Sequence, residues 1–175
     1  MTSNADDHLP NDSRLTLKAL GEASLSYVSA GQGVIELLPA GKPLAMLVYL
    51  AHCPGRAASR DHLLELLWAE HETAAAKHAM RQAVWYIRKR VGFSPLDVSK
   101  GMVRLTADLD LDAHRFLAAV EAGDLERAVE LYDGPFMADV ALPGGAEFEQ
   151  WAYAERVRLE SLLFRAADIV VHKYN

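Results

Sequence analysis

The spacing of apolar residues changes at Pro43, and this change limits the folds that the chain can adopt. Before Pro43, apolar and polar residues alternate over residues 14–19, and the alternation returns over residues 23–28. Residues 34–38 form a third apolar stretch after the turn-forming Gly31-Gln32-Gly33. A period of two is typical of half-buried strands, and short connections join antiparallel neighbours. The sequence therefore predicts a small antiparallel sheet at the start of the chain.

After Pro43 the apolar residues recur every three or four positions, which predicts three helices. The first begins at Pro43, a residue favoured in the first helical turn, and ends before Cys53-Pro54-Gly55. Ser59 is predicted to cap the second helix. The third runs from Thr73 to Val91, and Gly92 closes it as a C-terminal glycine does.

Two short extended segments, residues 96–100 and 102–106, follow these helices and flank a Lys-Gly turn. This pattern predicts a β-hairpin. A sheet, three helices and then a hairpin is the order of elements in a winged helix. We therefore expect a winged-helix domain over residues 14–107, with the hairpin as its wing.

The second half of the chain is predicted to be helical, with no strand beyond Thr106. Asp112 is the expected N-cap of a helix through Val120, and Gly123-Asp124 begins another through Tyr132. After a loop rich in Gly and Pro, a long helix is marked by one main stripe: Phe148, Trp151, Glu155, Leu159, Leu162, Ala166 and Ile169. Paired helices of this size predict a tetratricopeptide-like, all-α domain over residues 108–175, and the whole chain is expected to be α+β.

Charge divides the chain in the same way. Residues 14–107 hold 12 Lys or Arg against 7 Asp or Glu, a net of +5, whereas residues 108–175 hold 6 against 14, a net of −8. Residues 1–13 add −3 and are predicted to be a disordered tail. So sharp an asymmetry indicates that one half faces a polyanion, and the alternative is a chance segregation of solvated charge.

The third predicted helix carries residues suited to reading DNA. On a helical wheel, Met80, Val84, Ile87 and Val91 form the buried stripe. The positions opposite or flanking this stripe hold donors and cations: His78, Arg81, Gln82, Trp85, Arg88, Lys89 and Arg90. Bidentate Arg and an amide are the groups that base-edge recognition in a major groove requires. The alternatives are an ordinary amphipathic helix with a solvated basic face and, for Trp85, a protein-interface anchor.

Other residues near this helix are suited to phosphate contacts. Lys100 lies at the predicted hairpin tip and Arg104 on its second strand. Arg56, Ser59 and Arg60 lie at the start of the second helix, where backbone N–H groups also favour an anion. We expect these five residues to contact the DNA backbone.

Two sets of residues resemble a known family. In the first half they are Leu63-Leu64-Glu65-Leu66-Leu67-Trp68, Ala79-Met80-Arg81-Gln82-Ala83-Val84 and Ile87-Arg88-Lys89-Arg90-Val91. In the second half they are Gly123-Asp124-Leu125 with Ala128, Leu131-Tyr132-Asp133-Gly134-Pro135-Phe136, and Glu147-Phe148-Glu149-Gln150-Trp151 with Arg156, Arg158 and Leu159. Over residues 14–172 the chain resembles the SARP-type regulators, which join an OmpR/PhoB-type winged helix to a bacterial transcriptional activator domain (BTAD).

The resemblance implies a bacterial activator that binds direct repeats of double-stranded DNA upstream of promoters, recruits RNA polymerase and forms a homodimer through the helical domain. It implies these groove-facing positions: Lys77, His78, Arg81, Gln82, Trp85 and Lys89. Two of them depart from the family pattern. Trp85 stands where a polar or basic residue is usual, and His78 is neutral at pH 7 unless its pKa is shifted.

Several other classes of protein are not indicated. The lone Cys53 allows no internal disulfide, which suits a reducing cytosol, and no run of about 18 apolar residues could span a membrane. His71 and His78 are seven residues apart and His52 adjoins Cys53, but no convergent set of metal ligands or catalytic motif stands out. We therefore expect a cytoplasmic protein without metal, cofactor or catalytic activity.

The rival interpretation is a non-catalytic protein-interaction module made of a repurposed winged helix and a helical repeat. The charge division and Lys100 at the hairpin tip argue against it, whereas Trp85 and the low net basicity favour it. The two interpretations differ in salt dependence, because only DNA binding should weaken steeply as salt rises.

Overall fold

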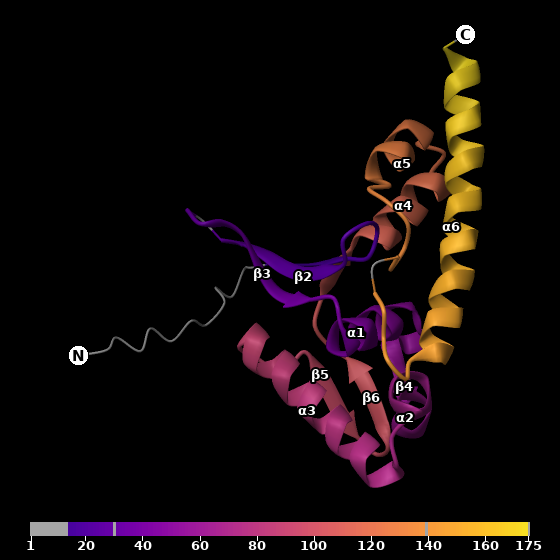
Figure 1. The fold of residues 1–175 in the computed structure, drawn as a ribbon. Helices are drawn as coiled ribbons and strands as arrows, with labels where there is room; N and C mark the ends of the chain where they lie inside the picture. Colours follow the sequence, from indigo (N-terminus) through magenta and orange to yellow (C-terminus); the bar gives the residue numbers. More distant parts are fainter. Residues whose placement is uncertain (1–13, 30, 139, 175) are drawn as a thin grey trace.

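The computed structural model describes residues 14–29, 31–138 and 140–174, which form a mixed α/β protein with six α-helices and two small β-sheets (Figure 1). The tail predicted to be disordered, residues 1–13, lies outside the described residues. Within the part of the chain that the structure describes, no helix is long and apolar enough to cross a membrane.

The first sheet has the strand order β3 (Gly33–Pro39), β2 (Ser24–Ser29), β1 (Leu15–Lys18) and β7 (Leu109–Leu111). Strands β1, β2 and β3 are antiparallel, as the alternating pattern predicts. The fourth strand was not expected, so the prediction that no strand follows Thr106 is wrong. β7 pairs in parallel with β1, which lies more than ninety residues earlier, and a three-residue strand with a distant partner leaves no local signal.

The three helices of the first half form where the sequence places them. α1 (Lys42–His52) has Pro43 in its first turn, and α2 (Arg60–Trp68) is capped by the Ser59 hydroxyl, which accepts from the His62 N–H at 3.1 Å. α3 spans Thr73–Val91, as predicted. It ends at Gly92, which has a φ of 84° and donates its N–H to the Arg88 carbonyl.

The predicted hairpin is also present. β5 (Leu96–Ser99) and β6 (Met102–Leu105) are antiparallel, and β4 (Ala57–Ser59) completes a second sheet of order β4-β6-β5. Lys100 and Gly101 form the turn with φ of 50° and 75°, values that favour a two-residue hairpin connection. The Arg60 N–H donates to the Gly101 carbonyl at 2.9 Å, which fixes the hairpin tip beside the start of α2.

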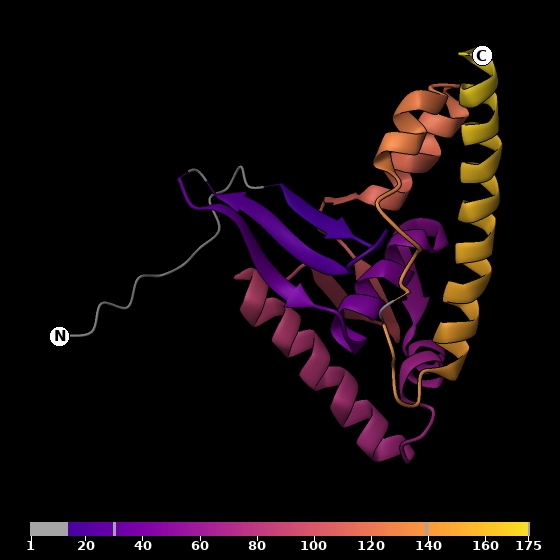
Figure 2. The same ribbon diagram turned by 45° about the horizontal axis from the view of Figure 1, so that its top comes forward.

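The second half contributes α4 (Asp112–Glu121), α5 (Leu125–Leu131) and α6 (Ala146–Lys173). In Figure 1 and Figure 2, α6 forms the right-hand edge of the molecule, with α4 and α5 beside its C-terminal part and α1 and α2 beside its N-terminal part. The predicted stripe of α6 is buried at Phe148, Leu159 and Ala166 but not at Ile169, which is 56% exposed. Ile169 lies near the start of α5, because Leu125 and Glu126 border the same shallow hollow.

Asp112 takes a different place from the one predicted. Leu111 is the N-cap of α4, and the buried Asp112 carboxylate instead accepts from the N–H groups of Ala19 and Leu20, both at 2.9 Å. Burial raises the pKa of Asp112, while the hydrogen bonds from these two N–H groups and from Ala113 act to lower it. The carboxylate thus joins the end of β1 to the start of α4.

A close backbone approach joins the halves at a second point. The Gly21 N–H donates to the Pro135 carbonyl at 3.2 Å and the Met137 N–H to the Ala19 carbonyl at 2.8 Å. A Cβ on Gly134 would lie 2.9 Å from the Gly21 Cα, so only glycine allows this contact. The buried side chains of both halves form one continuous core, and the boundary at residues 107–108 stays a prediction.

Candidate nucleic-acid interface

One face of α3 is held by the core. Met80, Ile87 and Val91 are almost fully buried, Ala76 and Ala83 also face inward, and Val84 is half-buried. This face packs on α1, α2 and β3. Its apolar stripe and the high helix propensity of its alanines explain why the segment is a helix and why the remaining faces point outward.

The outward face holds every residue of α3 predicted to read DNA, and all are exposed: Lys77, His78, Arg81, Gln82, Trp85, Arg88 and Lys89. Within the described residues, none of their charged groups forms an ion pair or a side-chain hydrogen bond. Among these described side chains, the Lys89 ammonium lies 4.9 Å from the centre of the Trp85 ring. Trp85 itself is 54% exposed. These donors are therefore open to an external ligand.

A groove of about 630 Å³ runs between α3, the start of α2 and the hairpin. Residues of all three elements line it: Lys77, Arg81, Trp85 and Arg88 from α3, Arg60 and Asp61 from α2, and Gly101 at the hairpin tip. Its floor is apolar and includes Leu64, Met80, Val84, Leu96 and Val98. Asp61 is the one acidic residue among the described residues that line the groove, and it partly offsets four cations.

Not every predicted residue enters this groove. Trp85, Arg88 and Lys89 also border a shallower depression with Gly92, at the C-terminal end of α3. His78 and Gln82 lie on the exposed crest of the helix, outside both hollows. Asp61 was not singled out from the sequence, because an acidic residue in the first turn of a helix is ordinary.

The five predicted backbone contacts divide into two kinds. Arg60 and Lys100 are exposed, and within the described chain their side chains have no hydrogen bond or ion pair. The other three have internal roles. The Arg56 guanidinium donates to the Ala107 carbonyl, Arg104 Nη1 donates to the Gly55 carbonyl at 2.8 Å, and Ser59 caps α2. A guanidinium has five N–H donors, so Arg56 and Arg104 could each donate to a phosphate as well.

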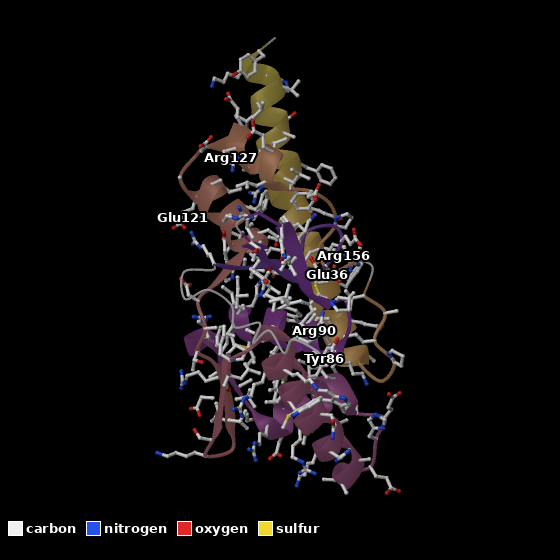
Figure 3. The ribbon with its side chains drawn as sticks, turned by 90° about the vertical axis from the view of Figure 1, so that its left-hand side faces the viewer. Glu36, Tyr86, Arg90, Glu121, Arg127 and Arg156 are labelled. Atoms are coloured by element: carbon white, nitrogen blue, oxygen red, sulfur yellow. The ribbon has the colours of Figure 1, made fainter. Side chains whose placement is uncertain are left out.

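We call the exposed α3 side chains from Lys77 to Lys89 named above, together with Arg60 and Lys100, the reading surface. Arg90 does not belong to it. Arg90 leaves α3 toward β3, whose Glu36 is labelled near it in Figure 3, and its Nε donates to the Leu37 carbonyl at 2.8 Å. This bond ties the C-terminal end of α3 to the first sheet.

A second cluster of polar and aromatic residues lies where the two halves meet, and we call it the seam: Tyr49, His52, Asp112, Phe136 and Trp151. The ring of Trp151 is 5.0 Å from that of Tyr49, 5.4 Å from that of His52 and 5.8 Å from that of Phe136, measured between centres. The Tyr49 hydroxyl is 2.6 Å from His62 Nε2. The seam therefore packs α1 against α6 and the loop before it.

The electrostatics of the seam favour neutral imidazoles. His52 Nδ1 is 2.7 Å from the Val48 carbonyl, whereas its buried Nε2 has no hydrogen-bond partner within the described chain. Burial lowers the pKa of His52. Burial also lowers the pKa of His114, whose ring centre is 5.0 Å away, and the positive charge of a protonated His52 and of Arg56 would lower it further. Among residues 14–29, 31–138 and 140–174, no group of three or more His, Cys, Asp or Glu is placed to hold a metal ion.

Comparison of the chain with models of known protein families finds no match, and a search of curated proteins finds no similar one. The geometry of the reading surface is the main indication of function.

Proposed function

We propose that this protein is a sequence-specific, double-stranded DNA-binding transcription regulator, acting as an activator. In this proposal α3 enters the major groove and the β5–β6 hairpin contacts the adjacent backbone through Lys100. The observation that carries it is the groove, in which cations from α2 and α3 meet beside the hairpin tip and have no side-chain partner in the described part of the chain.

The dimensions and chemistry of the reading surface support this proposal. A major groove about 12 Å wide accepts one α-helix, and the exposed Arg81 and Gln82 are the donors suited to guanine and adenine edges. Arg60, Lys77 and Arg88 lie around them, where they could neutralise phosphates. The order of a sheet, three helices and a hairpin that returns to β4 is the order expected of an OmpR/PhoB-type winged helix.

We propose that the second half is a tetratricopeptide-like partner domain of the BTAD kind, with RNA polymerase as one partner and promoter direct repeats as the DNA. Its three helices pack as neighbours, α4 on α5 and α5 on α6, which is compatible with such an arrangement. Its net charge of −8 would also oppose sequence-independent coating of DNA. Promoter binding would place the protein in the cytoplasm.

A second candidate is a protein-interaction module that uses the same surface. The observation that favours it is Trp85, a 54% exposed indole beside a groove with an apolar floor. Exposed aromatic residues of this kind are common interface anchors. An apolar protein interface would respond weakly to salt, whereas contacts to phosphates would respond strongly.

The test compares substitutions at three positions on a selected duplex. Arg81→Ala and Gln82→Ala should each weaken binding by about 1–3 kcal/mol and relax sequence preference, because each removes a base-edge contact. Lys100→Ala should weaken all duplexes alike, since a phosphate contact carries no sequence information. The matched control is Arg165→Ala, which removes an exposed Arg from α6. Unchanged affinity in Arg81→Ala and Gln82→Ala would show that α3 does not read the DNA.

A further inference from the structure

The groove beside α3 has an apolar floor that duplex DNA does not match. Leu64, Met80 and Leu96 are core residues, at most 9% exposed, but Val84 and Val98 are only half-buried and present apolar surface to the groove. In a duplex the backbone is charged and the base edges are polar, except for the thymine methyl. A duplex on the reading surface would therefore neutralise the cations of the groove and leave most of the floor without an apolar partner.

The cations of the groove stand beside this floor. At 100° per residue, Lys77, Arg81 and Arg88 fall within about 40° of one another on α3, and Val84 lies within about 60° of all three. Arg60 contributes a fourth cation from the start of α2, and Figure 1 shows α2, α3 and the β5–β6 hairpin in the lower part of the molecule. Within the described chain, the side chains of these four cations have no hydrogen bond or ion pair. Positive charge and apolar surface are thus available at one place.

The groove has the size of a small-molecule site. Its volume of about 630 Å³ falls within the roughly 300–1,000 Å³ of clefts that hold such ligands. Trp85 lines it with a 54% exposed indole, against which a flat aromatic ring can stack. The Arg81 guanidinium presents paired N–H donors that match the two oxygens of a carboxylate. A ligand that uses all of these groups has a flat apolar body and one negative charge.

We propose that this groove binds a small amphipathic anion, with a flat aromatic body of two or three rings and one acidic group such as a carboxylate. The body lies on the floor between Met80, Val84 and Val98, and the acidic group bonds to Arg81. Such a ligand would occupy the cations that phosphates require, so that ligand and duplex would exclude each other. This exclusion rests on the proposed function, whereas the ligand site itself does not.

The first test uses two fluorescent dyes with the same rings. 8-Anilinonaphthalene-1-sulfonate carries one negative charge, and N-phenyl-1-naphthylamine lacks only the sulfonate. With the full chain and no DNA, the sulfonate dye should occupy one site with a dissociation constant of roughly 20–50 μM, a usual affinity for a ligand of this size. The neutral dye should bind about tenfold more weakly or worse, because it makes no bond to a cation. Sulfate at the same concentration should not displace the dye, since it has no apolar body.

Three results of this titration would overturn the proposal. Equal affinities for the two dyes would show that the cations take no part. Displacement by sulfate would show a plain anion site. A sulfonate dye that does not bind below about 1 mM would show that the groove holds no ligand of this class.

Arg81→Met tests the position of the acidic group. It should weaken binding of the sulfonate dye by about tenfold and leave the neutral dye unchanged, because it removes the charge and keeps an unbranched side chain. Arg81 is exposed, so the variant should unfold at the same urea concentration as the unaltered protein. The matched control is Arg165→Met, which removes an exposed cation beside another hollow, between α4, α5 and α6. Loss of affinity in Arg165→Met but not in Arg81→Met would place the dye in that hollow and contradict the proposal.

Val98→Glu and Asp61→Asn test the rest of the site with opposite signs. Val98→Glu places a carboxylate on the floor and should weaken binding of both dyes by about tenfold or more. Asp61→Asn removes the acidic side chain that lines the groove and should strengthen binding of the sulfonate dye by roughly two- to threefold. If Val98→Glu is folded and binds the dyes as the unaltered protein does, the aromatic body does not lie on this floor.

The effect of the ligand on DNA binding is measured last. With the sulfonate dye at ten times its dissociation constant, the apparent dissociation constant for a selected duplex should rise about elevenfold, because dye and duplex compete for the same free protein. Dye binding that leaves duplex affinity unchanged would overturn the exclusion. A chain that binds the dyes as described but binds no duplex would contradict the proposed function and support the ligand site alone.

Discussion

The reading surface and the seam both contain polar and aromatic residues, but they use the polar groups in opposite ways. On the reading surface, Arg81, Gln82 and Lys100 are exposed and have no internal side-chain partner within the described chain. At the seam, Asp112 is buried and accepts three backbone N–H groups, and His52 is enclosed by aromatic rings. The polar groups of the reading surface are available to an external ligand, whereas those of the seam pack or bond internally and join the two halves.

This difference predicts that binding and stability can be changed separately. Surface residues without partners usually contribute less than about 0.5 kcal/mol to stability, whereas removing one partner of a buried hydrogen bond costs far more. Variants of the reading surface should therefore lose DNA affinity and keep the unfolding free energy. Variants of the seam should do the reverse.

The largest effect is expected at the seam, from Asp112→Ala. This substitution leaves the N–H groups of Ala19 and Leu20 buried without an acceptor, and it should lower the free energy of unfolding by about 2–5 kcal/mol. Urea unfolding followed by circular dichroism measures the loss. Below the unfolding transition, the variant should still bind DNA with the sequence preference of the unaltered protein.

The matched control is Asp124→Ala. The Asp124 carboxylate caps α5 by accepting from the Arg127 N–H at 3.2 Å, and it is exposed. Its loss should cost about 0.5–2 kcal/mol, the ordinary value of a helix cap. If the two aspartates cost the same, Asp112 does not join the halves in the way that the structure indicates.

The seam should also lose stability as the pH falls. The pKa of His52 is lowered in the folded protein by burial and by Arg158, and is raised by the Val48 carbonyl and Glu155. In the unfolded chain His52 is therefore protonated near pH 6.5, whereas in the folded chain it stays neutral until the pH is lower. The unfolding free energy should drop between pH 7.5 and 5.5, by at most about 1.4 kcal/mol per pH unit for this one group.

His52→Gln isolates this contribution, because glutamine stays neutral throughout the range. The slope of unfolding free energy against pH should become shallower in the variant, and the remainder should come in part from His114, whose pKa is also lowered. A slope identical to that of the unaltered protein would mean that His52 is not enclosed at the seam.

The smallest effect is expected on the reading surface, at Trp85. The thymine methyl is the apolar group that base edges present in the major groove, so an exposed indole beside Lys89 should favour thymine. Replacing that thymine by deoxyuridine should weaken binding by about 0.8 kcal/mol, or roughly fourfold. In Trp85→Ala the same replacement should have no effect, and an equal loss in both proteins would show that Trp85 does not contact the methyl.

Local patterns were enough to predict most of the elements. The helix from Thr73 to Val91, the Ser59 cap and the 96–106 hairpin depend on spacing, on capping chemistry and on a turn that tolerates positive φ. Each of these signals lies within a few residues of the element that it specifies. The exposed face of α3 could likewise be read from its wheel.

Contacts between distant residues could not be predicted in this way. β7 has three residues and gains its pairing from β1, and Asp112 has the sequence context of an N-cap but bonds to N–H groups at the end of β1. Arg56 and Arg104 were predicted to contact phosphates, yet each also donates a hydrogen bond to a backbone carbonyl elsewhere in the fold. The roles of these residues depend on partners that are distant in the sequence, and a local pattern cannot identify such partners.

The central claim is that the reading surface binds DNA by sequence. The most direct measurement is selection of bound sequences from a random duplex pool, followed by the affinity of the selected duplex as a function of salt. We expect enrichment of one motif and, for four phosphate contacts, a slope of log affinity against log salt of about −3.6. No enrichment, with weak binding to every duplex and little response to salt, would contradict it and would favour a protein ligand for this surface.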